Sequence, residues 1–162
     1  MSFDGTGYLL GPDDGPQWWL LDTRMNIKAA TGAFTLIEWS APEGFGPPPH
    51  IHGLEDEAFY ILDGEIDIEC GDKRFTAGPG DFALLPRGIP HGFVVTRGPV
   101  RGLQITTPSG FEEFVAEAGR PATRPGLPEP SVPDIPLLIA AGQRLGHQIV
   151  GPPPGPPSPG RS

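Results

Sequence analysis

Turn-forming residues divide most of this chain into segments too short for long helices. The 162 residues include 24 glycines and 23 prolines. Many short strands at close intervals, separated by such turns, are typical of antiparallel sandwiches and barrels. We therefore predict an all-β fold. The β-type runs that carry this prediction are Gln17–Leu21, Ala33–Trp39, Glu57–Leu62, Glu65–Cys70, Phe82–Leu85, Phe93–Thr96 and Val100–Thr106.

The pattern changes after the last of these runs. Ser109 and Glu112 have capping-box spacing ahead of an apolar stretch that stops at Gly119, which predicts a short helix. A weaker helical pattern covers residues 136–145. We expect residues 1–150 to form a single domain with these helices as covers. The Pro- and Gly-rich residues 151–162 offer almost nothing to bury and are predicted to be a flexible tail.

Charge and cysteine content exclude several classes of protein. The net charge is −9, and no basic cluster exceeds the pair Lys73-Arg74, so we expect no binding to nucleic acid or to an anionic membrane. Cys70 is the sole cysteine, which rules out an intrachain disulfide. The N-terminus lacks the basic and apolar regions of a signal peptide. The sequence therefore predicts a cytoplasmic protein.

Asp63-Gly64 is the sharpest turn signal in the chain. Asp-Gly between two alternating runs favours a two-residue hairpin, because both central residues need positive φ. This register places Glu57 opposite Cys70, on a face that is otherwise apolar. A carboxylate on a buried face is costly unless something pairs with it. The predicted face consists of Glu57, Phe59, Ile61, Ile66, Ile68 and Cys70.

Three histidines are candidates to share a site with this carboxylate. His50 and His52 lie two residues apart, so their side chains point the same way from an extended chain, and His91 precedes another apolar run. Three imidazoles and one carboxylate suit one divalent ion such as Mn, Fe, Co, Ni or Zn. We predict that His50, His52, Glu57 and His91 bind this ion. His147 is expected to be a surface residue or a hydrogen-bonded core residue.

The spacing of these residues forms two longer motifs. Residues 44–64 read G-x5-H-x-H-x4-E-x6-G, and residues 80–91 read G-x5-P-x-G-x2-H. Both stretches resemble the two motifs of the cupin superfamily, which implies a jelly-roll barrel, also called a double-stranded β-helix. The second motif departs from the family at Val95, where asparagine is usual. That asparagine is not a ligand, so the predicted metal site is unaffected.

A wider resemblance covers roughly residues 15–154. It includes EDEAFYILDGE, TTPSGFEEFVAEAG and QIVGPPP, and it points to the small single-domain cupins grouped with bacterial quercetin 2,3-dioxygenase. It implies a metal-dependent oxygenase in which the ion binds a deprotonated enolic substrate and Glu57 is both ligand and general base. O2 then cleaves the ring to an ester with loss of carbon monoxide. The resemblance also implies a homodimer.

Strand parity extends the predicted site beyond the ligands. Apolar side chains on the same inward faces would form a wall suited to an aromatic or polyketide-like small molecule. The alternative is that they are only core. Two other functions fit the same residues: an oxygen-independent cyclase or isomerase, and a binding protein whose metal organises the pocket. The predicted substrate contacts are Phe59, Ile61, Ile68, Phe93 and Val95.

Overall fold

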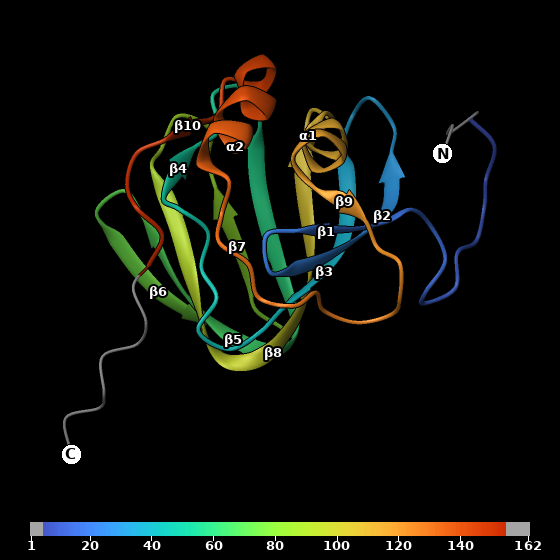
Figure 1. The fold of residues 1–162 in the computed structure, drawn as a ribbon, viewed down its shortest axis with the longest axis horizontal. Helices are drawn as coiled ribbons and strands as arrows, with labels where there is room; N and C mark the ends of the chain where they lie inside the picture. The colour runs from blue at the N-terminus through green and yellow to red at the C-terminus, as the bar shows by residue number, and fades with distance from the viewer. Residues whose placement is uncertain (1–4, 155–162) are drawn as a thin grey trace.

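The described part of the chain, residues 5–154 of a computed structural model, is mostly β-structure with two short helices (Figure 1). This confirms the predicted fold class. The helices are α1 (Phe111–Ala118) and α2 (Ile135–Gly142), and a 3₁₀ turn (Gln143–Leu145) follows α2. The strands are β1 (Gln17–Leu20), β2 (Thr23–Ala30), β3 (Thr35–Ala41), β4 (His50–Ile51), β5 (Asp56–Cys70), β6 (Lys73–Ala77), β7 (Phe82–Leu85), β8 (His91–Thr107), β9 (Arg120–Pro121) and β10 (Gln148–Ile149).

The two longest strands, β5 and β8, organise a single antiparallel sheet. The C-terminal half of β8 lies between β3 and β5, and its N-terminal end lies between β4 and β5. The sheet continues from β3 through β2 and β1 to β9, and from β4 to β10, while β5 also pairs with β6 and β7. The strands thus wrap the core as a jelly roll. Within residues 5–154 the ladder does not return to its first strand, so the roll is open rather than a closed barrel.

The predicted hairpin at Asp63-Gly64 is wrong. β5 runs straight through this dipeptide, and the chain reverses instead at Gly71-Asp72, where Cys70 pairs with Lys73. Gly64 has a φ of 80°, and the pairing of β5 with β8 shifts register around it. A bulge uses the same positive-φ glycine as a tight turn, and β8 is long enough to pair with both halves of β5. Cys70 consequently lies opposite His91, not opposite Glu57.

The predicted inward face nevertheless survives this correction. Glu57, Phe59 and Ile61 are buried before the bulge, and Ile66 and Ile68 are buried after it. Because of the register shifts, the odd-numbered residues of β5 face inward before the bulge and the even-numbered residues face inward after it. The predicted two-residue turn would have produced the same change. The hydrophobic pattern therefore identified the correct face although the cause assigned to it was wrong.

Five strands were absent from the sequence prediction: the two-residue strands β4, β9 and β10, and the longer strands β2 and β6. β2 contains Arg24, Lys28 and two alanines, which are weak β formers, and β6 begins with Lys73-Arg74. Pairing with neighbours decides their conformation: β2 lies between β1 and β3, and β6 lies along β5. Tertiary context overrides local preference in both cases.

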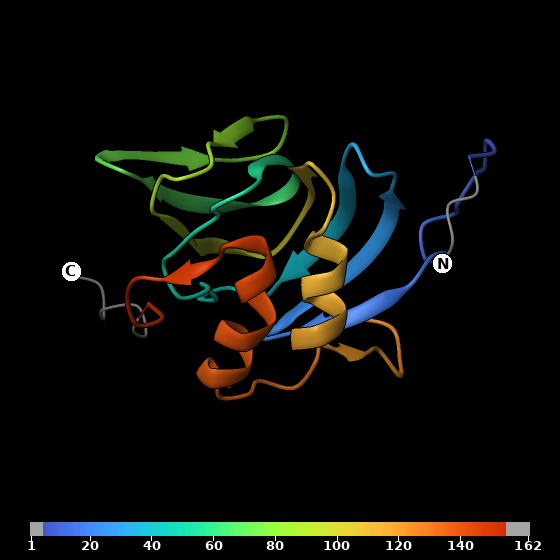
Figure 2. The same ribbon diagram turned by 90° about the horizontal axis from the view of Figure 1, so that it is seen from above.

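The two helices lie side by side over one end of the roll (Figure 2). α1 buries Phe111 and Val115 against the core and ends at Gly119, as predicted. Its N-cap is Gly110 rather than Ser109, and the N–H of Gly110 donates to the Glu112 carboxylate at 2.8 Å. Among the described residues, no helix is long and apolar enough to cross a membrane.

The predicted flexible tail lies mostly outside the described residues. Its first four residues, 151–154, lie along the loop before β4, where a Cβ on Gly46 would meet the Pro154 ring at 2.7 Å. A Cβ on Gly151 would likewise lie 3.4 Å from the Pro49 ring.

Candidate metal centre

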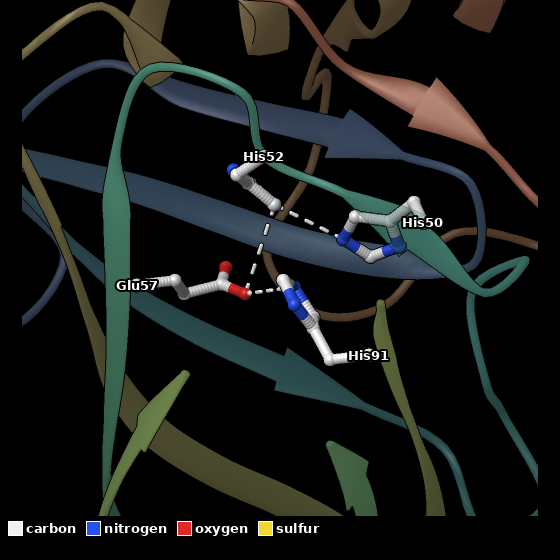
Figure 3. A group of neighbouring side chains, drawn as sticks. All are labelled: His50, His52, Glu57 and His91. Carbon is white, nitrogen blue, oxygen red and sulfur yellow. Dashed lines mark hydrogen bonds and ion pairs between the residues drawn. The ribbon is translucent and has the colours of Figure 1, made fainter. Parts of the chain in front are cut away.

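Four side chains from separate parts of the sheet converge at one point in the roll (Figure 3). His50 comes from β4, His52 follows it directly, Glu57 is near the start of β5, and His91 begins β8. One ligand atom from each lies within 4.8 Å of all the others. These are the four residues that the sequence predicts as metal ligands.

Backbone pairing holds these side chains together. His50 pairs directly with His91 between β4 and β8, which places both on the same face. His52 leaves the end of β4 in the same direction, and its ring lies 4.9 Å from that of His50, centre to centre. A hydrogen bond also joins the two motifs: the N–H of Gly88, in the turn before His91, donates to the carbonyl of His52 at 2.8 Å. Residues far apart in the sequence therefore form one compact cluster.

The Nδ1 atom of each histidine points away from the centre and forms a hydrogen bond there. Nδ1 of His50 lies 2.8 Å from the Pro48 carbonyl, and Nδ1 of His91 lies 3.0 Å from the Ile89 carbonyl. Nδ1 of His52 lies 2.7 Å from Oε1 of Glu55. Because these acceptors only receive hydrogen bonds, each Nδ1 carries the proton, and each Nε2 presents a lone pair to the centre. This is the arrangement of metal-binding histidines.

Two observations show that the Nε2 atoms facing the centre are arranged as a metal ion would require. Nε2 of His91 is buried without a hydrogen-bond partner, although it lies 3.1 Å from Oε2 of Glu57. Nε2 of His50 and Nε2 of His52 are 3.0 Å apart. Ligands at right angles around an ion, each about 2.1 Å from it, are separated by about 3.0 Å. Lone pairs facing one another at that distance repel unless a cation or proton lies between them.

Glu57 is held as a carboxylate with one oxygen directed at the histidines. Its side chain is buried; Oε2 lies 3.8 Å from Nε2 of His52, and Oε1 accepts a hydrogen bond of 2.5 Å from Gln104. Gln104 lies on β8, opposite Phe59. Because the amide occupies Oε1, Oε2 is the oxygen left for an ion or for a substrate proton.

Burial and neighbouring charges set the protonation of the cluster. Burial, and then repulsion by His52, lower the pKa of His50 to about 4. Burial would raise the pKa of Glu57, but attraction to His52 and the contact with His91 outweigh it and lower this pKa to about 2. Burial would lower the pKa of His52, but Glu57 and Glu55 outweigh it and raise this pKa. At neutral pH the centre therefore contains an ionised carboxylate and a neutral His50.

An apolar cavity that opens to the surface adjoins the centre. His50, His52 and Glu57 form part of its wall, and most of the remainder is hydrophobic. Ligand pockets typically combine an apolar lining with a few polar groups. The aromatic side chains of the lining are Trp39, Phe45, Phe59, Phe93, Phe111 and Phe114.

The five predicted substrate contacts divide between this cavity and the core. Phe59 and Phe93 line the cavity, with their ring centres 5.5 Å apart. Ile61, Ile68 and Val95 are buried deeper in the hydrophobic core and do not line it. Substrate contact by any of the five stays a prediction.

Three polar residues of the site were not singled out by the sequence analysis as functional. Gln104 orients Glu57, while Glu55 lies between His52 and His147. His147 is the hydrogen-bonded, largely buried residue that was expected, but it also lines the cavity. The position of His147 beside the predicted ligands depends on the C-terminal segment folding back onto β4, and no local sequence motif indicates this. Glu55 lies within the first motif, where its spacing from His52 offered the one available clue.

Comparisons with known proteins agree with the fold. Residues 38–106 match the family described as "Cupin domain". Two relatives are named quercetin 2,3-dioxygenase. The one from Bacillus subtilis is 25% identical over 118 residues, which cover 70% of this chain and 35% of the relative. The one from Aspergillus japonicus is 30% identical over 115 residues, which cover 64% of this chain and 33% of the relative. This chain thus spans about a third of their length.

A solved structure shows the same architecture. KdgF from Halomonas sp. superposes with a TM-score of 0.61 at 20% identity, over 66% of this chain and 98% of that one. At this identity the likeness concerns the fold alone.

Proposed function

This chain is a cupin, and we propose that it is a metal-dependent, quercetinase-like dioxygenase that acts on an enolic or phenolic aromatic compound. The observation that carries the proposal is the convergence of three Nε2 atoms and one carboxylate at the edge of an aromatic-lined cavity. The two relatives named quercetin 2,3-dioxygenase support it.

One divalent ion per chain, with Mn, Fe, Co, Ni and Zn as candidates, would be held by His50, His52, Glu57 and His91. When bound, such an ion lowers the pKa of a coordinated hydroxyl group and draws the oxyanion to the site. The hydrogen bonds of the three Nδ1 atoms orient the imidazoles before the ion arrives.

Glu57 would act as general base through Oε2. The hydrogen bond from Gln104 keeps Oε1 occupied, so Oε2 would direct one lone pair at the ion and the other at the point where a substrate hydroxyl would meet the ligands. A carboxylate within hydrogen-bond reach can take the proton of that hydroxyl. The enolate so formed would react with O2, and one carbon monoxide would leave for each O2 consumed as the ring opens to an ester.

The cavity favours a flat aromatic substrate. Phe59 and Phe93 meet edge to face, and Phe93 also contacts Trp39 and Phe45, so an aromatic ring would find aromatic partners on several sides. Phe111 and Phe114 of α1 border the same space. Few charged groups line this cavity apart from the ligand cluster, so a small sugar or amino acid would be poorly matched.

The test is oxygen uptake with quercetin by protein reconstituted separately with Mn, Fe, Co and Ni. We expect uptake with matching release of carbon monoxide, lost in Glu57→Gln and His52→Ala. Glu69→Gln is the matched control, because Glu69 lies on the same strand as Glu57 but is exposed. Turnover without oxygen would favour the cyclase or isomerase. Ligand binding without turnover would favour the binding protein. Dimerisation and location in the cell stay predictions.

A further inference from the structure

A second buried cluster adjoins the metal ligands. Oε1 of Glu55 lies 2.7 Å from Nδ1 of His52 and 2.8 Å from Nε2 of His147. Only 1% of Glu55 is exposed, and 9% of the His147 side chain. We propose that Glu55 and His147 are positioning residues of the metal centre. In this proposal Glu55 links ligand His52 to His147, so that the orientation of the ligand depends on the seating of residues 143–150. The inference rests on the proposed metal-dependent function.

A single carboxylate oxygen accepts both hydrogen bonds. Since a carboxylate has no proton to give, Nδ1 of His52 and Nε2 of His147 must both be donors. The donor role of Nδ1 leaves Nε2 of His52 as the lone-pair atom directed at the other ligands. The other two ligand histidines are oriented by main-chain carbonyls, which no side-chain substitution removes. The orientation of His52 is therefore the one that depends on a side chain, Glu55, which is held in turn by the distant His147.

The segment that carries His147 is docked directly on the ligand loop. β10 pairs with β4, placing Ile149 opposite His50, and Val150 N–H donates to the Pro49 carbonyl at 2.8 Å. Gly53 and Gly146 approach so closely that a Cβ on Gly53 would lie 2.7 Å from the Gly146 carbonyl oxygen. The short strand carrying His50 thus has β8 on one side and β10 on the other.

The same segment also connects the centre to the cavity and its helical cover. His147 lines the cavity, and its ring centre lies 4.3 Å from that of His52 and 5.1 Å from that of Phe114. Just before it, Arg144 pairs with Glu113 and Glu117 of α1. Loss of the Glu55–His147 contact would therefore loosen the carboxylate that orients His52 and free one wall of the cavity.

A second ion is the alternative use of this cluster, because the ligand atoms of His52, Glu55 and His147 also lie within 4.8 Å of one another. Such an ion would need Nδ1 of His52 as a ligand, whereas the geometry at hydrogen-bond distance favours a proton there. Metal stoichiometry separates the two uses.

The test is titration of the metal-free full chain with Co²⁺, followed by absorbance and metal analysis. His147→Phe removes the donor, while His147→Gln retains a side-chain N–H for Glu55. We expect His147→Phe to weaken Co²⁺ binding by about 10- to 100-fold and to shift the cobalt absorption bands. His147→Gln should restore part of both. Circular dichroism identifies any variant that fails to fold.

A backbone variant gives an independent measurement. Gly53→Ala would displace Gly146 and should weaken Co²⁺ binding in the same direction, while Gly78→Ala is the control because its Cβ would meet only the Asp81 side chain at 3.9 Å. Unchanged affinity and spectrum in a folded His147→Phe protein would overturn the proposal. Two ions per wild-type chain, falling to one in His147→Phe, would also overturn it. If wild type binds Co²⁺ but consumes no oxygen, only the proposed dioxygenase function fails.

Discussion

The inward faces of β5 and β8 have a polar end and an aliphatic end that differ sharply in chemistry, with an aromatic layer between them. At one end, Glu57 and His91 join the ligand cluster; one step inward, Phe59 and Phe93 line the cavity; one step further, Ile61 and Val95 are sealed in the core. The exposed fraction of Ile61 is 0%. Each strand changes from polar to aromatic to aliphatic over five residues, although all these side chains point the same way.

The difference shows that depth along a strand, and not only the face, determines the role of a side chain. The polar end is bounded by the short strand β4 and by the C-terminal segment, which leave a cavity. The aliphatic end has no such opening because the buried residues of β5, β7 and β8 fill it. Substitutions at the two ends should therefore have separate consequences: ligand loss at one, and loss of stability at the other.

The largest effect is expected from His91→Ala. The substitution removes one of the four proposed ligands and the imidazole paired with His50, so metal binding should weaken by more than the roughly 100-fold typical of an outer-sphere change. Calorimetric titration with Co²⁺ or Ni²⁺ would measure it. Retention of wild-type affinity would contradict the assignment of His91 as a ligand.

Ile61→Ala should give the opposite pattern. It leaves a cavity in a fully buried position, so the free energy of unfolding should fall by about 2–5 kcal/mol. Urea unfolding of the metal-free protein measures this change, and metal affinity of the folded variant should stay within about threefold of wild type. A large loss of metal affinity without a fall in the free energy of unfolding would contradict the proposed difference between the two ends.

Metal removal should destabilise the protein by a smaller amount. An ion at 100 times its Kd stabilises the folded state by about 2.7 kcal/mol, which corresponds to a melting temperature roughly 5–10 °C higher in a domain of this size. Differential scanning fluorimetry with and without a chelator would detect the shift. The same experiment on His91→Ala should show almost no difference between the two conditions.

Phe93→Leu tests the intermediate layer and should have the smallest effect. The variant keeps an apolar side chain but loses ring contacts with Phe45 and Phe59, which are worth about 0.5–1.5 kcal/mol each. KM for an aromatic substrate should rise by about 3- to 10-fold with little change in metal affinity. Phe82→Leu is the matched control, because Phe82 is 62% exposed on the opposite side of the sheet. Equal kinetics in the two variants would argue against substrate contact by Phe93.

Sequence patterns predicted the clustering of the four proposed ligands better than the chain path that brings them together. His50, His52, Glu57 and His91 follow from fixed spacing within two motifs, since each motif forms a local turn and strand. Asp63-Gly64 misled the strand assignment, because a positive-φ glycine serves a bulge as well as a hairpin.

Contacts between distant segments were beyond the reach of local patterns. The hydrogen bond between His147 and Glu55 joins residues 92 positions apart. Parity also could not separate Phe59, which lines the cavity, from Ile61, which does not. The position of His147 and the extent of the cavity both depend on the length of β4 and on the return of the C-terminal segment. Neither feature produces a periodic pattern in the sequence.

The most direct test of the central claim is anomalous diffraction from crystals of the protein loaded with Co²⁺. The account predicts one strong peak per chain, about 2.0–2.2 Å from Nε2 of His50, His52 and His91 and from Oε2 of Glu57. A fully loaded protein with its peak elsewhere, or with no peak among these four residues, would contradict the assignment of this cluster as the metal centre.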